Sequence, residues 1–348
     1  MTIELLKDIG EQGLLERLQP FCPPGIVGDD GAVIPPPESG QSLVITTDVL
    51  VNGVHFSDRY GGVSQCTTSP EDAGWRAAAA NLSDLAAMGA SPLGITVGLS
   101  LTGDVAVSWV ERLYQGMTQC LNQYNTPIVG GDICRSPVIA IAITAFGQVY
   151  PDRAIRRTGA KVGDAIVVTG VHGASRAGLE LLLKPDFGKH LSPEERLSLI
   201  KAHQRPQPRL DVIALLELQV NRLKLESSNL QLSIAGMDSS DGLADAIVQI
   251  CRASGVGAEI DSNRITLPQS LSKLVSPEQA LDWALYGGED FELVLCLPTE
   301  AAEELVAQLG EGAAVIGKIT SGNQVWLKDQ TGTYADQLLS LNKGFQHF

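Results

Sequence analysis

The chain has 348 residues, of which 44% are hydrophobic and 36 are glycine, a composition typical of a globular protein long enough for two domains. Its formal net charge of −15 argues against nucleic acid or an anionic membrane surface as a partner, because both attract basic proteins. An acidic protein of this kind could bind anionic phosphates only if metal cations lay between its carboxylates and the phosphate groups.

The sequence carries no sign of a membrane span or of export. No apolar run approaches the roughly 20 residues of a transmembrane helix, and the first residues lack the basic and apolar regions of a signal peptide. Six cysteines are widely spaced without a Cys-x-x-Cys pair, which favours free thiols over a disulfide framework or a zinc site. We therefore expect a cytoplasmic protein with no membrane or nucleic-acid partner.

The first half of the chain predicts alternating strands and helices. Apolar alternation and β-branched runs predict strands at residues 42–47, 93–101 and 139–146. An alanine- and leucine-rich segment predicts a helix over 72–88 that stops at Gly89, a common residue at helix C-termini. A second helix is expected over 105–124.

The pattern breaks near residue 150, where we place the boundary between a domain of residues 1–149 and one of residues 150–348. Beyond it we expect strands at 164–169, 258–260, 291–297 and 313–319, and helices at 174–183, 193–202, 208–217 and 243–253. Residues 184–210, rich in Pro, Lys, Arg and His, are expected to form a mobile surface excursion. The predicted fold class is mixed α/β (α+β) in two domains.

Five segments combine glycine, serine or threonine with aspartate after a plausible strand. They are residues 28–31, 46–48, 130–132, 237–242 and 287–290. A single Gly-Asp pair is most often an ordinary turn, but five such segments indicate converging ligands. Magnesium prefers oxygen ligands and is usually bound by a few carboxylates together with substrate phosphates, and phosphoryl transfer needs such cations.

Asn81 and Asp84 lie three residues apart inside the predicted helix of residues 72–88, on a shared face. The flanking residues are apolar nearly all round, which indicates a buried helix. Polar groups there cost stability unless they are bonded. A solvent-facing stripe is the alternative, and we favour a ligand role for Asp84.

Residues 238–243 join two aspartates and two serines to the start of a predicted helix, where free N–H groups and the helix dipole favour phosphate. Helix capping alone explains only one serine and one aspartate. The basic residues Arg153, Arg156, Arg157 and Lys161 could either contact nucleotide phosphate or line a solvated loop. The chain has no P-loop, no His-Arg-Asp kinase loop and no Gly-x-Gly-x-x-Gly fingerprint.

Taken in order, these motifs resemble the thiamine-monophosphate kinase family, within the superfamily named for aminoimidazole ribonucleotide synthetase. The most specific piece is Asn-Leu-Ser-Asp-Leu-Ala-Ala-Met-Gly-Ala at residues 81–90. The other matching pieces are residues 28–30, 46–48, 51–56, 130–132, 157–164, 238–243 and 287–293. The resemblance runs from about residue 4 to the end.

The resemblance implies a homodimer whose N-terminal domains pair their sheets into a barrel, with ATP near the domain cleft and residues 150–348 completing the active site. It implies direct transfer of the ATP γ-phosphate to thiamine monophosphate, giving thiamine diphosphate without a phosphoenzyme. No side chain is expected to act as a catalytic acid or base, because the acceptor phosphate is already ionised and Mg²⁺ ions would align the groups.

Site roles follow position by position from the resemblance. Magnesium ligands would be Asp30, Thr46, Thr47, Asp48, Asp84, Asp132, Asp238 and Asp241. ATP contacts would be Gly131, Arg157 and Ser240, with a looser match for Tyr114 stacking on adenine. The thiamine moiety would contact His55, Glu289 and Phe345.

The chain departs from the family pattern at a few positions. Ile133 stands where threonine is frequent, Phe291 where tyrosine is usual, and Phe345 where an aromatic residue with a polar tip is common. Stacking is retained at the two phenylalanines, whereas a hydrogen bond is lost. Residues 61–72 form a segment longer than is usual.

Two other interpretations stay open. One is a different ATP-dependent enzyme of the superfamily, such as aminoimidazole ribonucleotide synthetase, although residues 81–90 do not fit that enzyme. Two other members fit less well. Cys22 is followed by proline, unlike the reactive residue of selenophosphate synthetase, and the chain ends in Phe348 rather than in the cysteine of the hydrogenase-maturation protein. The other is a non-catalytic, acidic cation-binding protein, although nothing resembles a 12-residue EF-hand loop.

Overall fold

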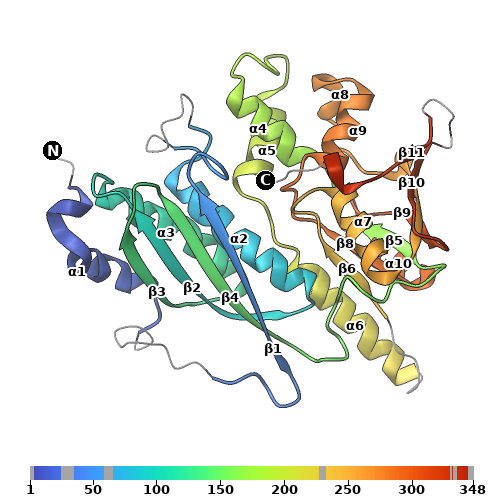
Figure 1. The fold of residues 1–348 in the computed structure, drawn as a ribbon, viewed down its shortest axis with the longest axis horizontal. Coiled ribbons are helices and arrows are strands. Elements are labelled where there is room, and N and C mark those ends of the chain that lie inside the picture. Colours follow the sequence, from blue (N-terminus) through green and yellow to red (C-terminus); the bar gives the residue numbers. More distant parts are fainter. Residues whose placement is uncertain are drawn as a thin grey trace. The chain divides into compact units, whose positions relative to one another are not determined.

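The computed structural model describes residues 4–24, 35–58, 66–226, 233–329, 331 and 335–343 (Figure 1). The chain divides into two compact units, which are described separately. Unit 1 comprises Met1–Leu85, Ala90–Asp152 and Gln204–Pro206, and unit 2 comprises Ala86–Gly89, Arg153–His203 and Gln207–Phe348. Each contains a sheet and helices, so the expected mixed α/β fold class is confirmed.

Unit 1 is built on a four-stranded sheet in the order β1-β4-β2-β3. Its strands are β1 (Ser42–Val51), β2 (Ser91–Leu101), β3 (Ile128–Arg135) and β4 (Ala140–Val149). The helices are α1 (Leu6–Leu18), α2 (Pro70–Ala87) and α3 (Val107–Leu121). β4 pairs antiparallel with β1 and with β2, whereas β2 and β3 run parallel.

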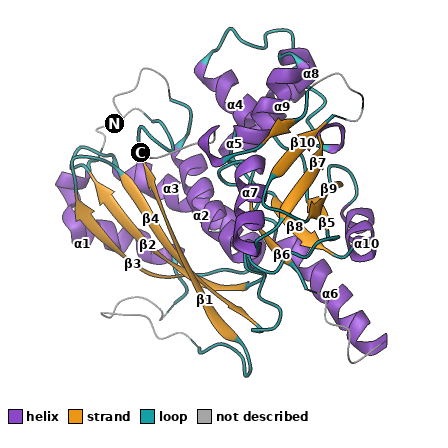
Figure 2. Cartoon of the chain, turned by 45° about the vertical axis from the view of Figure 1, so that its right-hand side comes forward, coloured by secondary structure: helices purple, strands orange, loops and turns teal. Residues whose placement is uncertain are grey.

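The two faces of this sheet differ in burial because side chains alternate along each strand. Val97, Ile141 and Ile143 lie on the buried face, which α2 and α3 cover (Figure 2). On β1 the opposite face carries Ile45 and Val49, which are 58% and 48% exposed. The sheet therefore presents an open apolar face alongside a packed one.

Helices α2 and α3 approach each other closely enough for their backbones to touch. A Cβ atom on Gly116 would lie 1.8 Å from the Glu71 carbonyl oxygen, and one on Gly74 would lie 1.9 Å from that of Leu113. Only glycine fits at either position. Helix α2 ends at Ala87, and the turn that follows contains Gly89, whose φ of 69° suits a residue without a side chain.

Unit 2 contains a seven-stranded sheet in the order β11-β10-β7-β9-β5-β8-β6. Its strands are β5 (Ala165–Val168), β6 (Ala235–Asp238), β7 (Gly257–Asp261), β8 (Leu293–Leu297), β9 (Ala314–Thr320), β10 (Val325–Lys328) and β11 (Gln337–Leu338). The helices are α4 (Ala174–Leu183), α5 (Pro193–Gln204), α6 (Leu210–Glu226), α7 (Leu243–Ser254), α8 (Leu271–Leu274), α9 (Pro277–Tyr286) and α10 (Thr299–Leu309).

Helices cover both faces of this sheet. Ile247 of α7 and Ala284 of α9 belong to the apolar cluster on one face, and Leu216 of α6 and Leu305 of α10 belong to the cluster on the other. The inner strand β8, which lies between β5 and β6, is therefore buried along its whole length.

Three expectations about the acidic segments are wrong in detail. Residues 46–48 lie inside β1 rather than at its end, and residues 130–132 lie inside β3. Glycine is needed in β3 because a Cβ atom on Gly131 would lie 2.2 Å from the Val97 carbonyl oxygen of β2. Residues 287–290 precede β8 instead of following a strand, whereas Asp238 ends β6 as predicted.

The expected surface excursion of residues 184–210 is only partly at the surface. It contains α5, and its Leu191 and Leu199 join a buried apolar cluster with Leu181 of α4. The apolar residues spaced along the excursion explain this packing, which its polar composition concealed.

All six cysteines are free, and three of them are buried. Burial raises the pKa of Cys251 to about 11 and that of Cys120 to about 12, because a thiolate is poorly solvated in an apolar core. In the described part of the chain, no helix is long and apolar enough to cross a membrane.

The contact between α2 and α3 predicts a large cost for one added methyl group. Gly116→Ala should lower the free energy of unfolding by about 2 kcal/mol or more, since the new Cβ would overlap a backbone carbonyl. Gly103→Ala is the matched control, because the nearest atom to its new Cβ lies 3.8 Å away. Urea unfolding of both variants measures the difference, and equal destabilisation would contradict the packing described.

Candidate functional site

In unit 1, predicted ligands of β1 and α2 meet on the buried face of the sheet. Thr46 and Asp48 face α2 because they alternate with the exposed residues of β1. The Thr46 hydroxyl donates a short hydrogen bond to the Asp84 carboxylate, and the Asp48 N–H donates to Asn81 Oδ1 at 3.3 Å. The Thr46 hydroxyl and the Asp84 carboxylate, from distant parts of the sequence, are thereby in contact, and the backbone of Asp48 is bonded to the same helix.

The helix that carries Asp84 is buried, as its apolar sequence indicates. Asn81 and Ser83 are fully buried, and the Asn81 amide donates to the Ala77 carbonyl at 3.0 Å. The alternative of a solvent-facing polar stripe is therefore wrong. Asp84 is partly exposed, so its carboxylate combines a packed helix with access to a ligand.

Two other predicted ligands of unit 1 lie on the open face. The Thr47 hydroxyl is 2.9 Å from that of Thr144. Asp132 is exposed and in register with Gly98, at the opposite edge of the sheet from β1. Three strand spacings of about 4.8 Å separate β1 from β3, or about 14 Å. Within one chain, Asp132 is thus not part of the cluster around Asp84.

His55 lies in the turn after β1, where its ring is oriented by the backbone. The Val51 N–H donates to His55 Nδ1 at 3.1 Å, which leaves the proton of the neutral ring on Nε2. The Arg76 guanidinium of α2 donates to the His55 carbonyl at 3.3 Å and is 3% exposed. The motifs of the sequence do not point to Arg76 as a residue of this site. The available signal is its charge, because a cation inside an apolar helix needs a polar partner.

Tyr114 does not suit its predicted role. Its side chain is 5% exposed, and its ring centroid is 5.5 Å from that of Phe21. Burial raises the pKa of the Tyr114 hydroxyl because the phenolate would be poorly solvated. The prediction that Tyr114 stacks on adenine is corrected, since the ring fills the apolar core of α3. Asp30 and Phe345 lie outside the described residues.

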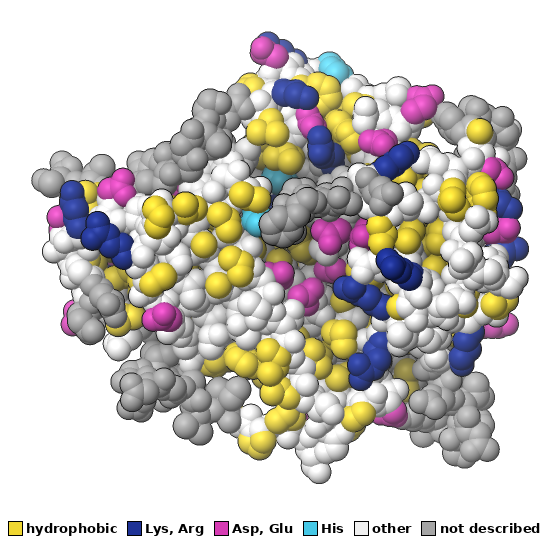
Figure 3. Space-filling view, viewed as in Figure 1, with side chains coloured by type: hydrophobic (Ala, Val, Ile, Leu, Met, Phe, Trp, Pro, Cys, Tyr) yellow, Lys and Arg dark blue, Asp and Glu magenta, His cyan; other side chains and the backbone are white. Residues whose placement is uncertain are grey.

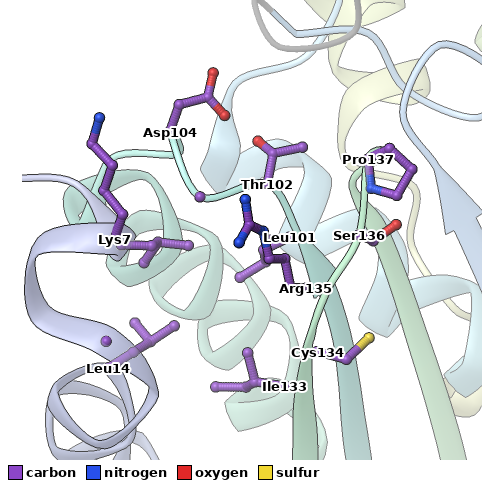
Figure 4. Close-up of a pocket in the computed structure, with 13 residues that line it drawn as sticks. Lys7, Leu14, Leu101, Thr102, Asp104, Ile133, Cys134, Arg135, Ser136 and Pro137 are labelled. Atoms are coloured by element: carbon purple, nitrogen blue, oxygen red, sulfur yellow. The ribbon is translucent and has the colours of Figure 1, made fainter.

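A pocket of about 790 Å³ lies in unit 1 between α1 and the ends of β2 and β3 (Figure 4). Its lining combines apolar Leu14 and Leu101 with the charged side chains of Lys7, Asp104 and Arg135. None of the predicted ligands within the described ranges lines it. The pocket is therefore separate from the cluster around Asp84.

In unit 2, residues 238–241 form a loop between β6 and α7, called here the 238–241 loop. The Ser240 hydroxyl donates to Asp238 Oδ1 at 2.9 Å, while Asp241 is exposed. Helix α7 begins after Gly242, and no side chain of the loop caps it. Capping therefore does not explain these serines and aspartates, and the helix N-terminus suits an anion.

A second loop of unit 2, residues 287–291, contacts the first. The Glu289 N–H donates to the Ser240 carbonyl at 2.7 Å. A Cβ atom on Gly288 would lie 2.8 Å from the same oxygen, so glycine permits the close approach. The predicted nucleotide contact Ser240 and the predicted thiamine contact Glu289 are thus adjacent.

Two partly buried carboxylates follow Glu289 and secure the 287–291 loop. Asp290 accepts hydrogen bonds from the N–H groups of Gly173 (2.7 Å) and Ser175 (2.9 Å) at the start of α4. Burial raises the pKa of Asp290 to about 7, although these two bonds oppose the shift.

The second of these carboxylates, Glu292, accepts from the Thr169 hydroxyl at 2.6 Å and forms an ion pair with Arg209. Burial raises the pKa of Glu292, and the Arg209 charge opposes the shift. Arg209 lies 83 residues away in the sequence, so no local motif predicts this pair.

Arg157 lies along α7 rather than in either loop. Its exposed guanidinium forms a short hydrogen bond to Gln249, and its carbonyl accepts from the Ser254 hydroxyl at 3.0 Å. This places a cation beside the helix that follows the 238–241 loop. Its predicted contact with nucleotide phosphate stays a prediction.

The donor chemistry of both clusters fits magnesium. Over the described residues, no three His, Cys, Asp or Glu side chains are grouped closely enough to enclose a metal ion. Asp48, Asp84 and Thr46 nevertheless form an oxygen-only set, and Asp238 with Asp241 forms another pair. Magnesium needs no all-protein cage, because it commonly keeps water and takes substrate phosphates as its remaining ligands.

Comparison with known proteins covers both units. Family models described as AIR synthase related protein, N-terminal domain and C-terminal domain match residues 28–149 and 161–329. The chain is 50% identical to the thiamine-monophosphate kinase of Synechococcus elongatus, over 100% of this chain and 99% of that protein.

Solved structures extend this similarity to the fold. The crystal structure of thiamine-monophosphate kinase from Stenotrophomonas maltophilia matches with a TM-score of 0.74 at 31% identity, covering 90% of this chain and 94% of that one. AaThiL complexed with AMPPCP and TMP matches with a TM-score of 0.70 at 32% identity, covering 96% and 98% of the two chains. Both structures are similar over nearly the full length.

The buried His172 beneath the 238–241 loop predicts a pH dependence of stability. It lies 3.1 Å from the Ser239 hydroxyl through Nε2, and burial lowers its pKa from 6.5 to about 4. Between these values the unfolded chain binds a proton that the folded chain excludes. The contribution of His172 to the free energy of unfolding should therefore fall as the pH decreases from about 6.5 to about 4, by up to about 1.4 kcal/mol per pH unit. Asp290, whose pKa is raised to about 7, contributes in the opposite direction over this window.

His172→Asn removes this contribution, so the free energy of unfolding of the variant should fall less, or rise more, than that of the wild-type chain as the pH decreases over the same window. Urea unfolding at pH 7, 6 and 5 gives the two slopes, which do not depend on any constant loss of stability in the variant. Equal slopes for the wild-type chain and the variant would contradict the buried, neutral state of His172.

Proposed function

The chain belongs to the thiamine-monophosphate kinase family, and we propose that it transfers the γ-phosphoryl group of ATP to thiamine monophosphate, giving thiamine diphosphate and ADP. Similarity over the whole chain, at 50% identity to one such kinase, supports this assignment. The observation in the molecule that carries it is the contact between Ser240 and Glu289. That contact joins the residues we assign to the donor and to the acceptor.

We propose several Mg²⁺ ions as the metal cofactor. Thr46, Asp48 and Asp84 would hold one in unit 1, and Asp238 and Asp241 would hold another in unit 2. The assigned ligands Asp30, Thr47 and Asp132 complete the proposal, with Asp132 at the far edge of the sheet. Bound magnesium neutralises phosphate charge, which reconciles anionic substrates with a chain of net charge −15.

The protein's own part in the reaction is to bind and orient the two phosphates. The acceptor phosphate is ionised near neutral pH, so no side chain has to remove a proton from it. Gly131, Arg157 and Ser240 are proposed to contact ATP. His55, Glu289 and Phe345 are proposed to hold the thiamine moiety, whose thiazolium ring carries a permanent positive charge that the Glu289 carboxylate complements.

We assign magnesium and ATP binding together with dimerisation to residues 1–149, and further ATP and thiamine contacts to residues 150–348. We also propose that the enzyme acts in the cytoplasm. Six free cysteines, three of them buried, support a reducing compartment.

We further propose that the chain forms a homodimer through the open face of the unit 1 sheet, the two sheets pairing into a barrel. Leu43, Ile45 and Val49 of β1 are about half exposed on this face, and Figure 3 shows hydrophobic side chains at the surface over the sheet. Exposed apolar side chains gathered on one sheet face are typical of a surface that a partner covers.

Removing one proposed metal ligand should abolish turnover and leave the fold intact. Asp48→Asn and Asp84→Asn should each lower kcat for thiamine diphosphate formation by about 100-fold or more, the usual scale for losing one electrostatic contact to a reacting phosphate. Asp186→Asn is the control, since that carboxylate is 92% exposed. Wild-type turnover in either folded variant would refute the proposed metal site.

A charge on the open sheet face should dissociate the dimer. Ile45→Glu buries a carboxylate if two sheets pair there, so light scattering after gel filtration should show a monomer. Val162→Glu, at a residue 62% exposed in unit 2, should leave the mass unchanged. A wild-type chain that is monomeric, or a dimer that survives Ile45→Glu, would exclude this interface.

A further inference from the structure

Glu289 belongs to a closed network of four side chains in unit 2. His203 Nδ1 lies 3.5 Å from the Glu289 carboxylate and 3.2 Å from the Ser175 hydroxyl. The Ser175 N–H in turn donates to Asp290 Oδ1 at 2.9 Å. Because Asp290 follows Glu289 in the chain, the backbone closes the ring. None of these contacts is needed for the chemistry of phosphoryl transfer itself.

The network is most exposed at the group proposed to meet the substrate, while its histidine and serine are buried. His203 is 3% exposed and Ser175 is 1% exposed, whereas the Glu289 side chain is 34% exposed. His203 lies in the last turn of α5 and Ser175 in the first turn of α4. Leu181 and Leu199 pack these two helices into one apolar cluster. The support behind Glu289 is therefore rigid, and only its carboxylate faces outward.

The backbone of the 287–291 loop adds a second observation. Glu289 and Phe291 have φ values of 60° and 54°, in the left-handed region that residues with side chains seldom adopt. Such a conformation persists only where surrounding contacts determine it, and it concentrates at ligand-binding positions. Asp290 lies between the two and is held by the N–H groups of Gly173 and Ser175. Its carboxylate therefore secures the loop in the conformation that presents Glu289.

We propose that His203 and Asp290 are positioning residues for the thiamine moiety, His203 by fixing the direction of the Glu289 carboxylate and Asp290 by fixing the backbone that carries it. The proposal rests on the proposed function, in which Glu289 faces the cationic thiazolium group. Neither residue touches the reacting phosphates. They determine the affinity for thiamine monophosphate and leave the rate of transfer from bound ATP nearly unchanged.

Steady-state kinetics distinguishes an effect on the binding of thiamine monophosphate from an effect on the binding of ATP. His203→Ala should raise KM for thiamine monophosphate about tenfold, or about 1.4 kcal/mol, because the Glu289 carboxylate loses the side chain that orients it, while KM for ATP and kcat stay within about threefold. His203→Asn, which keeps an amide near the position of Nδ1, should recover part of the loss. Asp290→Asn keeps one acceptor oxygen and should raise the same KM. His190→Ala, at an exposed histidine of the same segment, is the matched control.

A double-mutant cycle distinguishes positioning from general stabilisation. If His203 acts through Glu289, adding His203→Ala to Glu289→Gln should raise KM for thiamine monophosphate no further than Glu289→Gln alone. Multiplicative effects, a fall in kcat without a change in KM, or equal changes in both KM values would overturn the proposal. Should His203→Ala not fold, His203→Asn goes through the same cycle with the same criteria.

The wild-type chain is assayed first, so that the two proposals fail separately. No thiamine diphosphate from ATP, Mg²⁺ and thiamine monophosphate would remove the proposed function. Wild-type turnover with independent effects of His203 and Glu289 would remove only the positioning role.

Discussion

Repulsion between two phosphorylated substrates is the constraint on which this structure depends. A chain with a net charge of −15 cannot hold ATP and a second phosphate by its own field. Instead it gathers carboxylates and hydroxyls where cations can enter. In unit 1 these groups come from β1 and α2, and in unit 2 from the loop between β6 and α7. The acidity of the chain is therefore part of its proposed chemistry.

Each cluster is held by packing that a ligand would not disturb. Asp84 projects from a helix whose neighbouring Asn81 is fully buried, and α2 is locked to α3 by Gly74 and Gly116. In unit 2, Glu292 and Arg209 form a partly buried ion pair beside the loop that carries Glu289. Such a pair is costly to break, because either partner alone would be a poorly solvated, uncompensated charge. The candidate groups of unit 1 thus lie on a strand and a helix, and those of unit 2 lie on short loops between rigid elements.

Local sequence predicted the elements whose cause is local. Alternation gave the strands around residues 42–47, 93–101 and 139–146, and the alanine-rich run that stops at Gly89 gave α2. Prediction from local sequence failed where a tertiary contact determines the conformation of a segment. The glycines of residues 130–132 were assigned to a turn, whereas Gly131 is required by the close approach of β3 to Val97. The helices α1, α8, α9 and α10 and the strands β10 and β11 were not predicted.

In the candidate site, too, local motifs predicted individual residues but not the tertiary contacts between them. Asp48, Asp84, Ser240 and Glu289 could be named from motifs. The contacts of β1 with α2 in unit 1, and of Ser240 with Glu289 in unit 2, could not. The partners His203, Arg209 and Ser175 lie in ordinary sequence far from the loops they support. Tyr114 was misassigned because an aromatic residue in a helix is as readily a core residue as a stacking surface.

The central claim is direct transfer of phosphate between two small molecules bound by this chain. The most direct test is ³¹P NMR of the purified protein with ATP, thiamine monophosphate and Mg²⁺. We predict that thiamine diphosphate and ADP appear together in equal amounts, and that both stop when the metal is chelated. Release of inorganic phosphate without thiamine diphosphate, or product formation that persists after chelation, would contradict the account.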